Sequence, residues 1–193
     1  MNKLLKIALS FLLGASLYTN AQALDWDSQS LVGVEFGYGS MDVEGEFSKE
    51  SKNPILAGVK LGSKNKNFRL YLSANYLNIS DFDFSMMYGA DVQYLFPLTR
   101  EFDVYVGLNG GVINLSFDPS RYDSLATAGG RDILQYYAGA DVGMDYIFSK
   151  EWSAELGLRY LYLDIAHTKF NETYKIDSMT QLYMGLIYRY YTH

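Results

Sequence analysis

The sequence contains no cysteine, only two histidines and only three prolines among its 193 residues. Without cysteine the chain has no disulfide framework, no catalytic thiol and no cysteine-ligated zinc site. The two histidines, His167 and His193, leave little scope for a histidine-based metal site. Lys and Arg number 16 against 22 Asp and Glu, a formal net charge of −6. This balance disfavours a nucleic-acid partner, which would require a basic patch. We therefore predict no cofactor, no metal ion and no nucleic-acid partner.

Only one apolar run stands out, the 11 residues 7–17 near the N-terminus. Lys3 and Lys6 precede this run, and Ala21 and Ala23 follow it in the small–x–small arrangement of a signal-peptide cleavage site. A membrane-spanning helix needs about 20 apolar residues, so the run is too short to be an anchor. We predict a secretory signal peptide over 1–23, cleaved after Ala23, and a mature domain over 24–193.

Tyrosine is abundant, with 18 copies, and tyrosine is favoured in β-strands. After residue 30, apolar side chains recur at every second position, as in Tyr88, Ala90 and Val92. Residues two apart share one face of a strand, whereas on a helix they have no common face. Eight segments carry this alternation: 32–39, 55–62, 68–76, 87–96, 102–112, 136–148, 152–160 and 181–190. The pattern predicts an all-β fold of eight antiparallel strands.

The connections between these segments alternate in length. Three are short, at 63–67, 97–101 and 149–151. Four are longer, at roughly 40–53, 78–85, 114–132 and 164–178. Outer-membrane barrels have short periplasmic turns and longer extracellular loops. The alternation therefore predicts an up-and-down transmembrane β-barrel in the bacterial outer membrane, with four long extracellular loops and, because the strand number is even, both termini in the periplasm.

The alternation alone does not decide which face is inside, because a soluble barrel would turn its apolar face inward. Aromatic residues bracket the apolar face at a repeated spacing of eight residues, as in Phe68 and Tyr76 or Trp152 and Tyr160. Eight tilted strand residues rise about 20 Å, close to the ~25 Å apolar band of membrane barrels with its aromatic girdles. The opposite face is rich in glycine, which makes room for long side chains in a narrow interior. Both features favour an apolar outer face.

Near the C-terminus, Gly185, Tyr188 and Tyr190 match the polar–x–Gly–x–x–aromatic–x–aromatic assembly signal of outer-membrane barrels, although three further residues follow. With the signal peptide and the eight strands, the mature chain resembles the small eight-stranded outer-membrane barrels of the OmpA membrane domain and OmpX type. The resemblance implies insertion by the barrel-assembly machinery into outer-membrane lipid, and a monomeric barrel. It does not imply one function, since fold and function are separable.

Ten charged residues fall on the predicted inner face, and they are the candidate functional set. A pore lining or proton path would use such charges, but eight strands leave room only for side chains or one small ligand. Since an unpaired buried charge costs several kcal/mol, we expect a salt-bridged plug. The ten residues are Glu35, Lys60, Arg69, Asp91, Asp103, Asp141, Asp145, Glu155, Arg159 and Arg189.

Three functions are compatible with this pattern. The first is a non-enzymatic barrel with an envelope-structural or surface-interaction role carried by its long loops. The second is a narrow channel for small solutes. The third is a lipid A-modifying enzyme, for which His167 with Asp164 or Glu172 would be a remnant of the catalytic site, but no serine partner lies nearby. We predict the first, with no catalytic residue, and the sequence leaves the extracellular ligand unknown.

Overall fold

The computed structural model describes residues 28–44, 49–79, 82–117, 132–169 and 172–191, and these residues form nine β-strands. The predicted cleavage residues Ala21 and Ala23 lie outside them. The strands are β1 (Ser28–Glu44), β2 (Lys49–Lys52), β3 (Ile55–Asn65), β4 (Phe68–Asn78), β5 (Phe82–Pro97), β6 (Phe102–Phe117), β7 (Asp132–Ile147), β8 (Trp152–Lys169) and β9 (Glu172–Tyr191). Among the described residues, no helix is long and apolar enough to cross a membrane.

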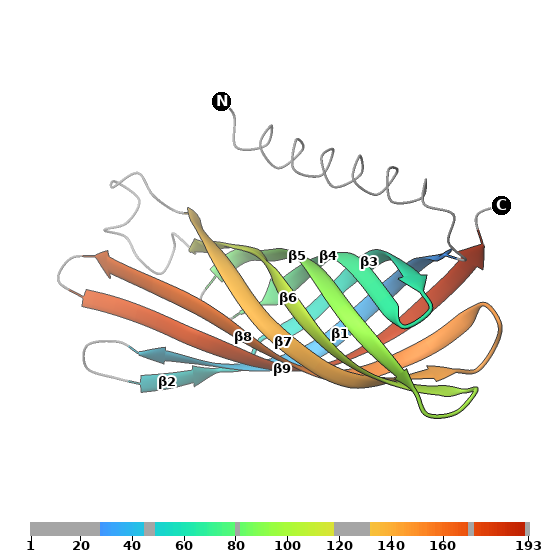
Figure 1. The fold of residues 1–193 in the computed structure, drawn as a ribbon. Coiled ribbons are helices and arrows are strands. Elements are labelled where there is room, and N and C mark those ends of the chain that lie inside the picture. The colour runs from blue at the N-terminus through green and yellow to red at the C-terminus, as the bar shows by residue number, and fades with distance from the viewer. Residues whose placement is uncertain (1–27, 45–48, 80–81, 118–131, 170–171, 192–193) are drawn as a thin grey trace.

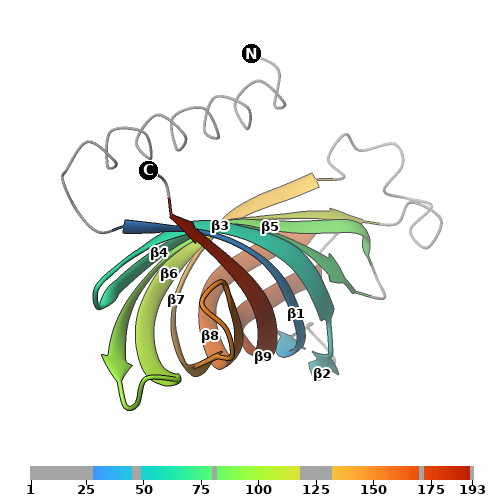
Figure 2. The same cartoon turned by 90° about the vertical axis from the view of Figure 1, so that its right-hand side faces the viewer.

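Eight of the strands close into a barrel (Figures 1 and 2). Each strand pairs antiparallel with its neighbour in the chain, and β1 also pairs with β9, from Gln29 opposite Tyr191 to Glu44 opposite Lys175. We call the end that holds Gln29 and Tyr191 the proximal end. It carries the turns at 66–67, 98–101 and 148–151, and the opposite, distal end carries the other connections. The predicted eight-stranded antiparallel up-and-down barrel is confirmed.

The ninth strand, β2, is a continuation of β3 rather than an additional strand of the barrel wall. We call each of the eight strands of the wall a stave. Both β2 and β3 pair with β1: β3 lies opposite residues 28–38 and β2 opposite residues 41–44. Pro54 separates them, because proline has no N–H to donate to the ladder. Its carbonyl oxygen still accepts a hydrogen bond from the Gly39 backbone N–H at 2.7 Å. The interruption is therefore local, and β2 with β3 acts as one barrel strand.

The prediction of four long connections is wrong for three of them. The distal connections are residues 45–48, 79–81, 118–131 and 170–171, so only one is longer than four residues. Strands β1, β8 and β9 run far into segments that the alternation pattern left as loops. The reason is that a ladder is held by backbone hydrogen bonds, whereas the pattern reports only side chains, and the pattern changes where the strands leave the apolar band.

The apolar face points outward and the charged face inward. Val32, Val34 and Phe36 are exposed on β1, whereas Glu35 between them is completely buried. The same alternation holds on β5, where Val92 is exposed and Gln93 is buried. A soluble barrel would show the opposite arrangement. The barrel is thus apolar on its outside and polar within over most of its height.

Candidate functional site: the barrel interior

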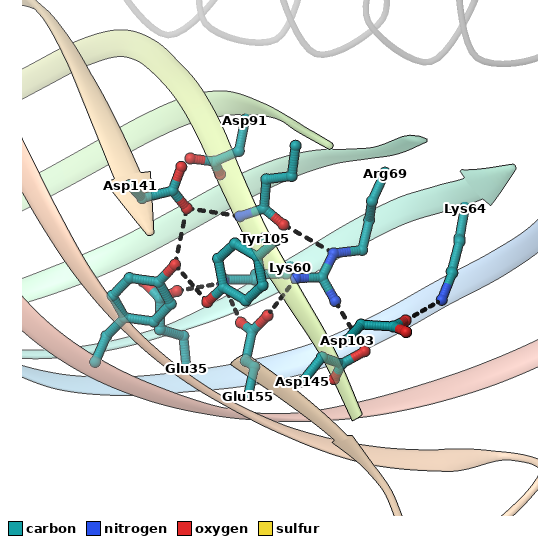
Figure 3. A network of polar contacts seen from close by, with 12 residues as sticks. Glu35, Lys60, Lys64, Arg69, Asp91, Asp103, Tyr105, Asp141, Asp145 and Glu155 are labelled. Carbon is teal, nitrogen blue, oxygen red and sulfur yellow. Dashed lines mark hydrogen bonds and ion pairs between the residues drawn. The ribbon is translucent and has the colours of Figure 1, made fainter. Parts of the chain in front are cut away.

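The ten candidate charged residues are all buried inside the barrel, each with no more than 6% of its surface exposed. They come from all eight staves: Glu35 from β1, Lys60 from β3, Arg69 from β4, Asp91 from β5, Asp103 from β6, Asp141 and Asp145 from β7, Glu155 and Arg159 from β8, and Arg189 from β9. Strands far apart in sequence therefore contribute to one polar interior (Figure 3).

Lys60 occupies the centre of this interior. Its ammonium group makes ion pairs with Glu35 of β1 and with Glu155 of β8. It also lies over the rings of Tyr71 and Tyr183, 5.1 and 4.7 Å from their centroids. Aromatic faces attract cations most strongly where water is excluded. Lys60 is thus neutralised by two carboxylates and enclosed by two rings.

Arginine side chains extend the network on either side of Lys60. The Arg69 guanidinium lies 3.1 Å from Glu155 and 3.3 Å from Asp145, which also pairs with Arg189 at 2.7 Å. Arg159 reaches Glu35 at 3.1 Å. Because Glu35 and Glu155 each contact two cations, these pairs form one connected network rather than separate bridges.

Arg159 also approaches Asp91, at 3.6 Å. Two of the ten residues stand apart from this network of ion pairs. Asp103 pairs with Lys64 at 2.8 Å, near the proximal turns, where both side chains are slightly exposed. Asp141 has no cation within salt-bridge distance among the described residues, and its Oδ2 instead accepts hydrogen bonds from Gln93 Nε2 at 2.6 Å and from the Tyr183 hydroxyl at 2.8 Å.

Several interior residues were not in the candidate set. Lys64 was placed in a turn by its sequence context, although it belongs to β3. Tyr105 and Tyr183 meet through their hydroxyl groups at 2.9 Å. Opposing glycines make this contact possible, because a Cβ on Gly143 or Gly157 would lie 2.4 or 2.6 Å from the Tyr105 hydroxyl oxygen. Glycine and tyrosine on one face of neighbouring strands are the signal that could have identified these positions.

The distal part of the interior is apolar, which the sequence analysis did not predict. Most of the apolar inward residues lie distal to the charged ones, as Leu77 does to Arg69 and Ile113 to Asp103, whereas Leu31 and Leu95 are buried on the proximal side. Together the distal residues form a buried cluster of Met41, Leu56, Leu77, Ile79, Met87, Ile113, Leu115, Tyr137, Leu161, Leu163 and Met179. The interior therefore consists of a charged layer and an apolar layer in series.

The predicted assembly residues lie on β9. Tyr188 and Tyr190 point outward, and the Tyr188 ring lies 5.0 Å from that of Trp152. Gly185 faces inward, where a Cβ would come within 2.7 Å of the Glu155 carboxylate. The side chain of His167 lies outside the described residues. In the part of the chain that the structure describes, no group of three or more His, Cys, Asp or Glu side chains is suited to hold a metal ion.

Replacing Lys60 by Met should be strongly destabilising. It leaves Glu35 and Glu155 each short of one cation in a buried site, and breaking such a pair costs about 3–5 kcal/mol. The matched change Lys64→Met affects a pair that water reaches, so its cost should stay below about 1 kcal/mol. Urea unfolding of the two refolded variants measures this difference, and equal costs would contradict a dry central network.

The glycine–tyrosine contact gives a second test. Gly157→Ala should cost about 1–3 kcal/mol, because its Cβ forces Tyr105 and Tyr183 apart. Gly110→Ala is the control on the outer face, where the nearest atom to a new Cβ is 3.4 Å away. Both variants have the same composition, so thermal melting in one detergent compares them directly. A Gly157→Ala variant as stable as Gly110→Ala would show that the tyrosine pair does not need the glycine.

Comparison with known proteins identifies the fold but no close relative. No family model and no curated protein sequence matches the chain. Among solved structures, Neisserial surface protein A is similar over 83% of this chain and 97% of its own, with a TM-score of 0.60 and 14% identity. Outer membrane protein H of P. aeruginosa covers 84% and 99%, with a TM-score of 0.55 and 20% identity. The chain therefore has the fold of the small eight-stranded outer-membrane β-barrels.

Proposed function

We propose that this protein spans the bacterial outer membrane as a monomeric, non-conducting and non-enzymatic barrel, whose distal end has an envelope-structural or surface-interaction role. The observation that carries the proposal is the arrangement of the two faces: a continuous apolar outside around a filled interior. Soluble monomers rarely expose apolar patches larger than a few hundred Å². The exposed apolar residues here encircle the barrel on all eight staves, which suits lipid as the surrounding solvent.

Aromatic pairs mark the proximal border of this apolar band. Phe68 packs against Tyr94 with ring centroids 5.1 Å apart, and Phe102 stacks on Tyr146 at 4.7 Å. Aromatic girdles at the two interfaces are typical of membrane barrels. At the distal border the corresponding residues are exposed tyrosines, Tyr38, Tyr76 and Tyr160. The band is therefore bounded at both ends by side chains that suit the lipid headgroup region.

On β1 and β4 the two faces exchange character beyond the distal tyrosines. Past Tyr38 the outward residue is the exposed Ser40 and the inward residue is the buried Met41. Past Tyr76, Leu77 is buried inside and Asn78 is exposed outside. A polar outside around an apolar core is the arrangement of a protein in water. We infer that this distal part of the barrel stands outside the lipid on the cell surface.

The filled interior supports a non-conducting barrel. A permeating solute would have to break the buried ion pairs of Lys60 and Arg69 and then cross the apolar cluster. The charged layer and the apolar layer both fill the interior, so the side chains of each would have to move aside. Because the interior is filled, it supports neither the channel nor an enzyme that acts there.

The topology follows from the same assignment. With the distal end at the cell surface, both termini lie in the periplasm, where the signal peptide 1–23 would be removed. Tyr188 and Tyr190 would be presented to the barrel-assembly machinery during insertion. The surface role then depends on the distal strand extensions and on the connection at 118–131.

The membrane assignment is tested by two exposed leucines of similar exposure. Leu108 lies within the apolar band and is 71% exposed, whereas Leu98 lies in a proximal turn and is 67% exposed. Leu108→Arg should cost about 2–4 kcal/mol in lipid vesicles, because an arginine near the bilayer midplane has no water or countercharge. Leu98→Arg should cost about 0–1 kcal/mol. If urea titrations give equal costs, the apolar face does not meet lipid.

The proposed function itself is tested by electrical recording and by gene deletion. The purified barrel in planar bilayers should show no regular conductance steps, since its interior is filled. A deletion strain should keep its small-solute permeability and lipid A composition and should change in surface adhesion or envelope integrity. Reproducible single-channel steps would support the narrow channel instead, and altered lipid A would support the enzyme.

A further inference from the structure

Among the described residues, the buried interior contains one more carboxylate than cations. Leaving aside the pair of Asp103 and Lys64, which water reaches, its acids are Glu35, Asp91, Asp141, Asp145 and Glu155, and its bases are Lys60, Arg69, Arg159 and Arg189. Every one of these acids except Asp141 has a cation within salt-bridge distance. A net charge is expensive to bury. Neutralising the interior therefore takes one further positive charge near Asp141, either a bound cation or a proton.

Asp141 lies in a block of two polar side chains and two glycines on β6 and β7. Asp141 is opposite Gly107, and Asn109 is opposite Gly139. A Cβ on Gly107 would lie 2.3 Å from Asp141 Oδ1, and a Cβ on Gly139 would lie 2.7 Å from Asn109 Oδ1. The side-chain oxygens Asp141 Oδ1 and Asn109 Oδ1 thus each lie over a glycine, in space that the Cβ atom of any other residue would fill.

Asp91 completes this block from the neighbouring strand. Asp91, on β5, lies directly opposite Asn109 on β6. Figure 3 shows Asp91 and Asp141 next to each other at one border of the network. The Arg159 guanidinium engages only the Oδ1 atom of Asp91, at 3.6 Å.

Three oxygens in this block have no hydrogen-bond partner: Asp91 Oδ2, Asn109 Oδ1 and Asp141 Oδ1. Their side chains are 3, 7 and 4% exposed. Most buried polar atoms are paired, so three unpaired acceptors on adjacent residues need an explanation. The amide nitrogen of Asn109 is unpaired as well, so it does not donate to either carboxylate. Carboxylate and amide oxygens are the ligands that hard cations prefer.

We propose that Asp91, Asn109 and Asp141 bind one alkali-metal cation inside the barrel. A single positive charge equals the deficit of the buried groups, whereas a divalent ion would leave the interior with a net positive charge. Each carboxylate keeps one oxygen on its protein partners and offers the other to the ion. The cation takes the place of the missing basic side chain and stabilises β5, β6 and β7 against one another.

The test is equilibrium unfolding of the refolded mature chain in NaCl and in N-methylglucamine chloride at the same ionic strength and pH. A ligand that binds only the folded state lowers the unfolding constant in proportion to its concentration above the dissociation constant. We expect about a tenfold fall in the unfolding constant for each tenfold rise of Na⁺ in that range, and no such fall with N-methylglucamine.

Variants assign the effect to the block. Asp141→Asn and Asn109→Leu should lose the Na⁺ dependence, and Asp103→Asn, which alters a carboxylate near the proximal turns, should retain it. Crystals grown with Tl⁺ in place of Na⁺ should show an anomalous peak among the three oxygens. Equal stability of the wild type in both salts would overturn the proposal, and so would a Na⁺ dependence that persists in Asp141→Asn. A wild-type stability that depends on pH and not on Na⁺ would instead assign the missing charge to a proton shared by Asp91 and Asp141.

Discussion

The ion pairs of Lys60 with Glu35 and Glu155 hold together strands that are remote in the chain. They join β3 to β1 and to β8 across the interior. In a barrel with an apolar outside, the inner face is the only place for charged side chains, and there each charge needs a partner because water is largely excluded. The network around Lys60 satisfies this need for most of the interior. It favours one set of inward-facing residues, and with them the register of the strands that contribute to it.

The second constraint is space. Eight strands enclose an interior that side chains fill, so each large inward residue requires a small one opposite. The tyrosines of the charged layer lie against glycines of neighbouring strands, as Tyr105 does against Gly143 and Gly157. Distal to that layer, methionine, leucine and isoleucine side chains take over. The exchange of polar and apolar faces past Tyr38 and Tyr76 supports a barrel that emerges from the lipid as a water-exposed platform, which is where a surface role would lie.

The sequence predicted the eight staves and the direction of their faces, because a period of two is a direct signature of a strand and glycine on the polar face indicates a crowded interior. It also predicted the charged residues of the inner face. It did not predict which charged side chains form ion pairs with one another, since Lys60 and Glu155 meet only after the barrel closes. It missed the distal strand ends, where backbone pairing outlasts the apolar alternation. The apolar distal cluster was missed for the same reason: Leu161 and Leu163 lie beyond 160, where the predicted strand ended.

The central claim is that the apolar face meets lipid and the interior is closed. Nuclear Overhauser effects between lipid acyl chains and methyl groups, measured in lipid nanodiscs, test it most directly. Leu108 and Val92 are exposed on the outside, whereas Ile113 and Leu161 belong to the buried distal cluster. The account predicts strong lipid contacts for the methyl groups of the first two residues and none for those of the last two. Lipid contacts at Ile113 and Leu161, with none at Leu108 and Val92, would contradict it.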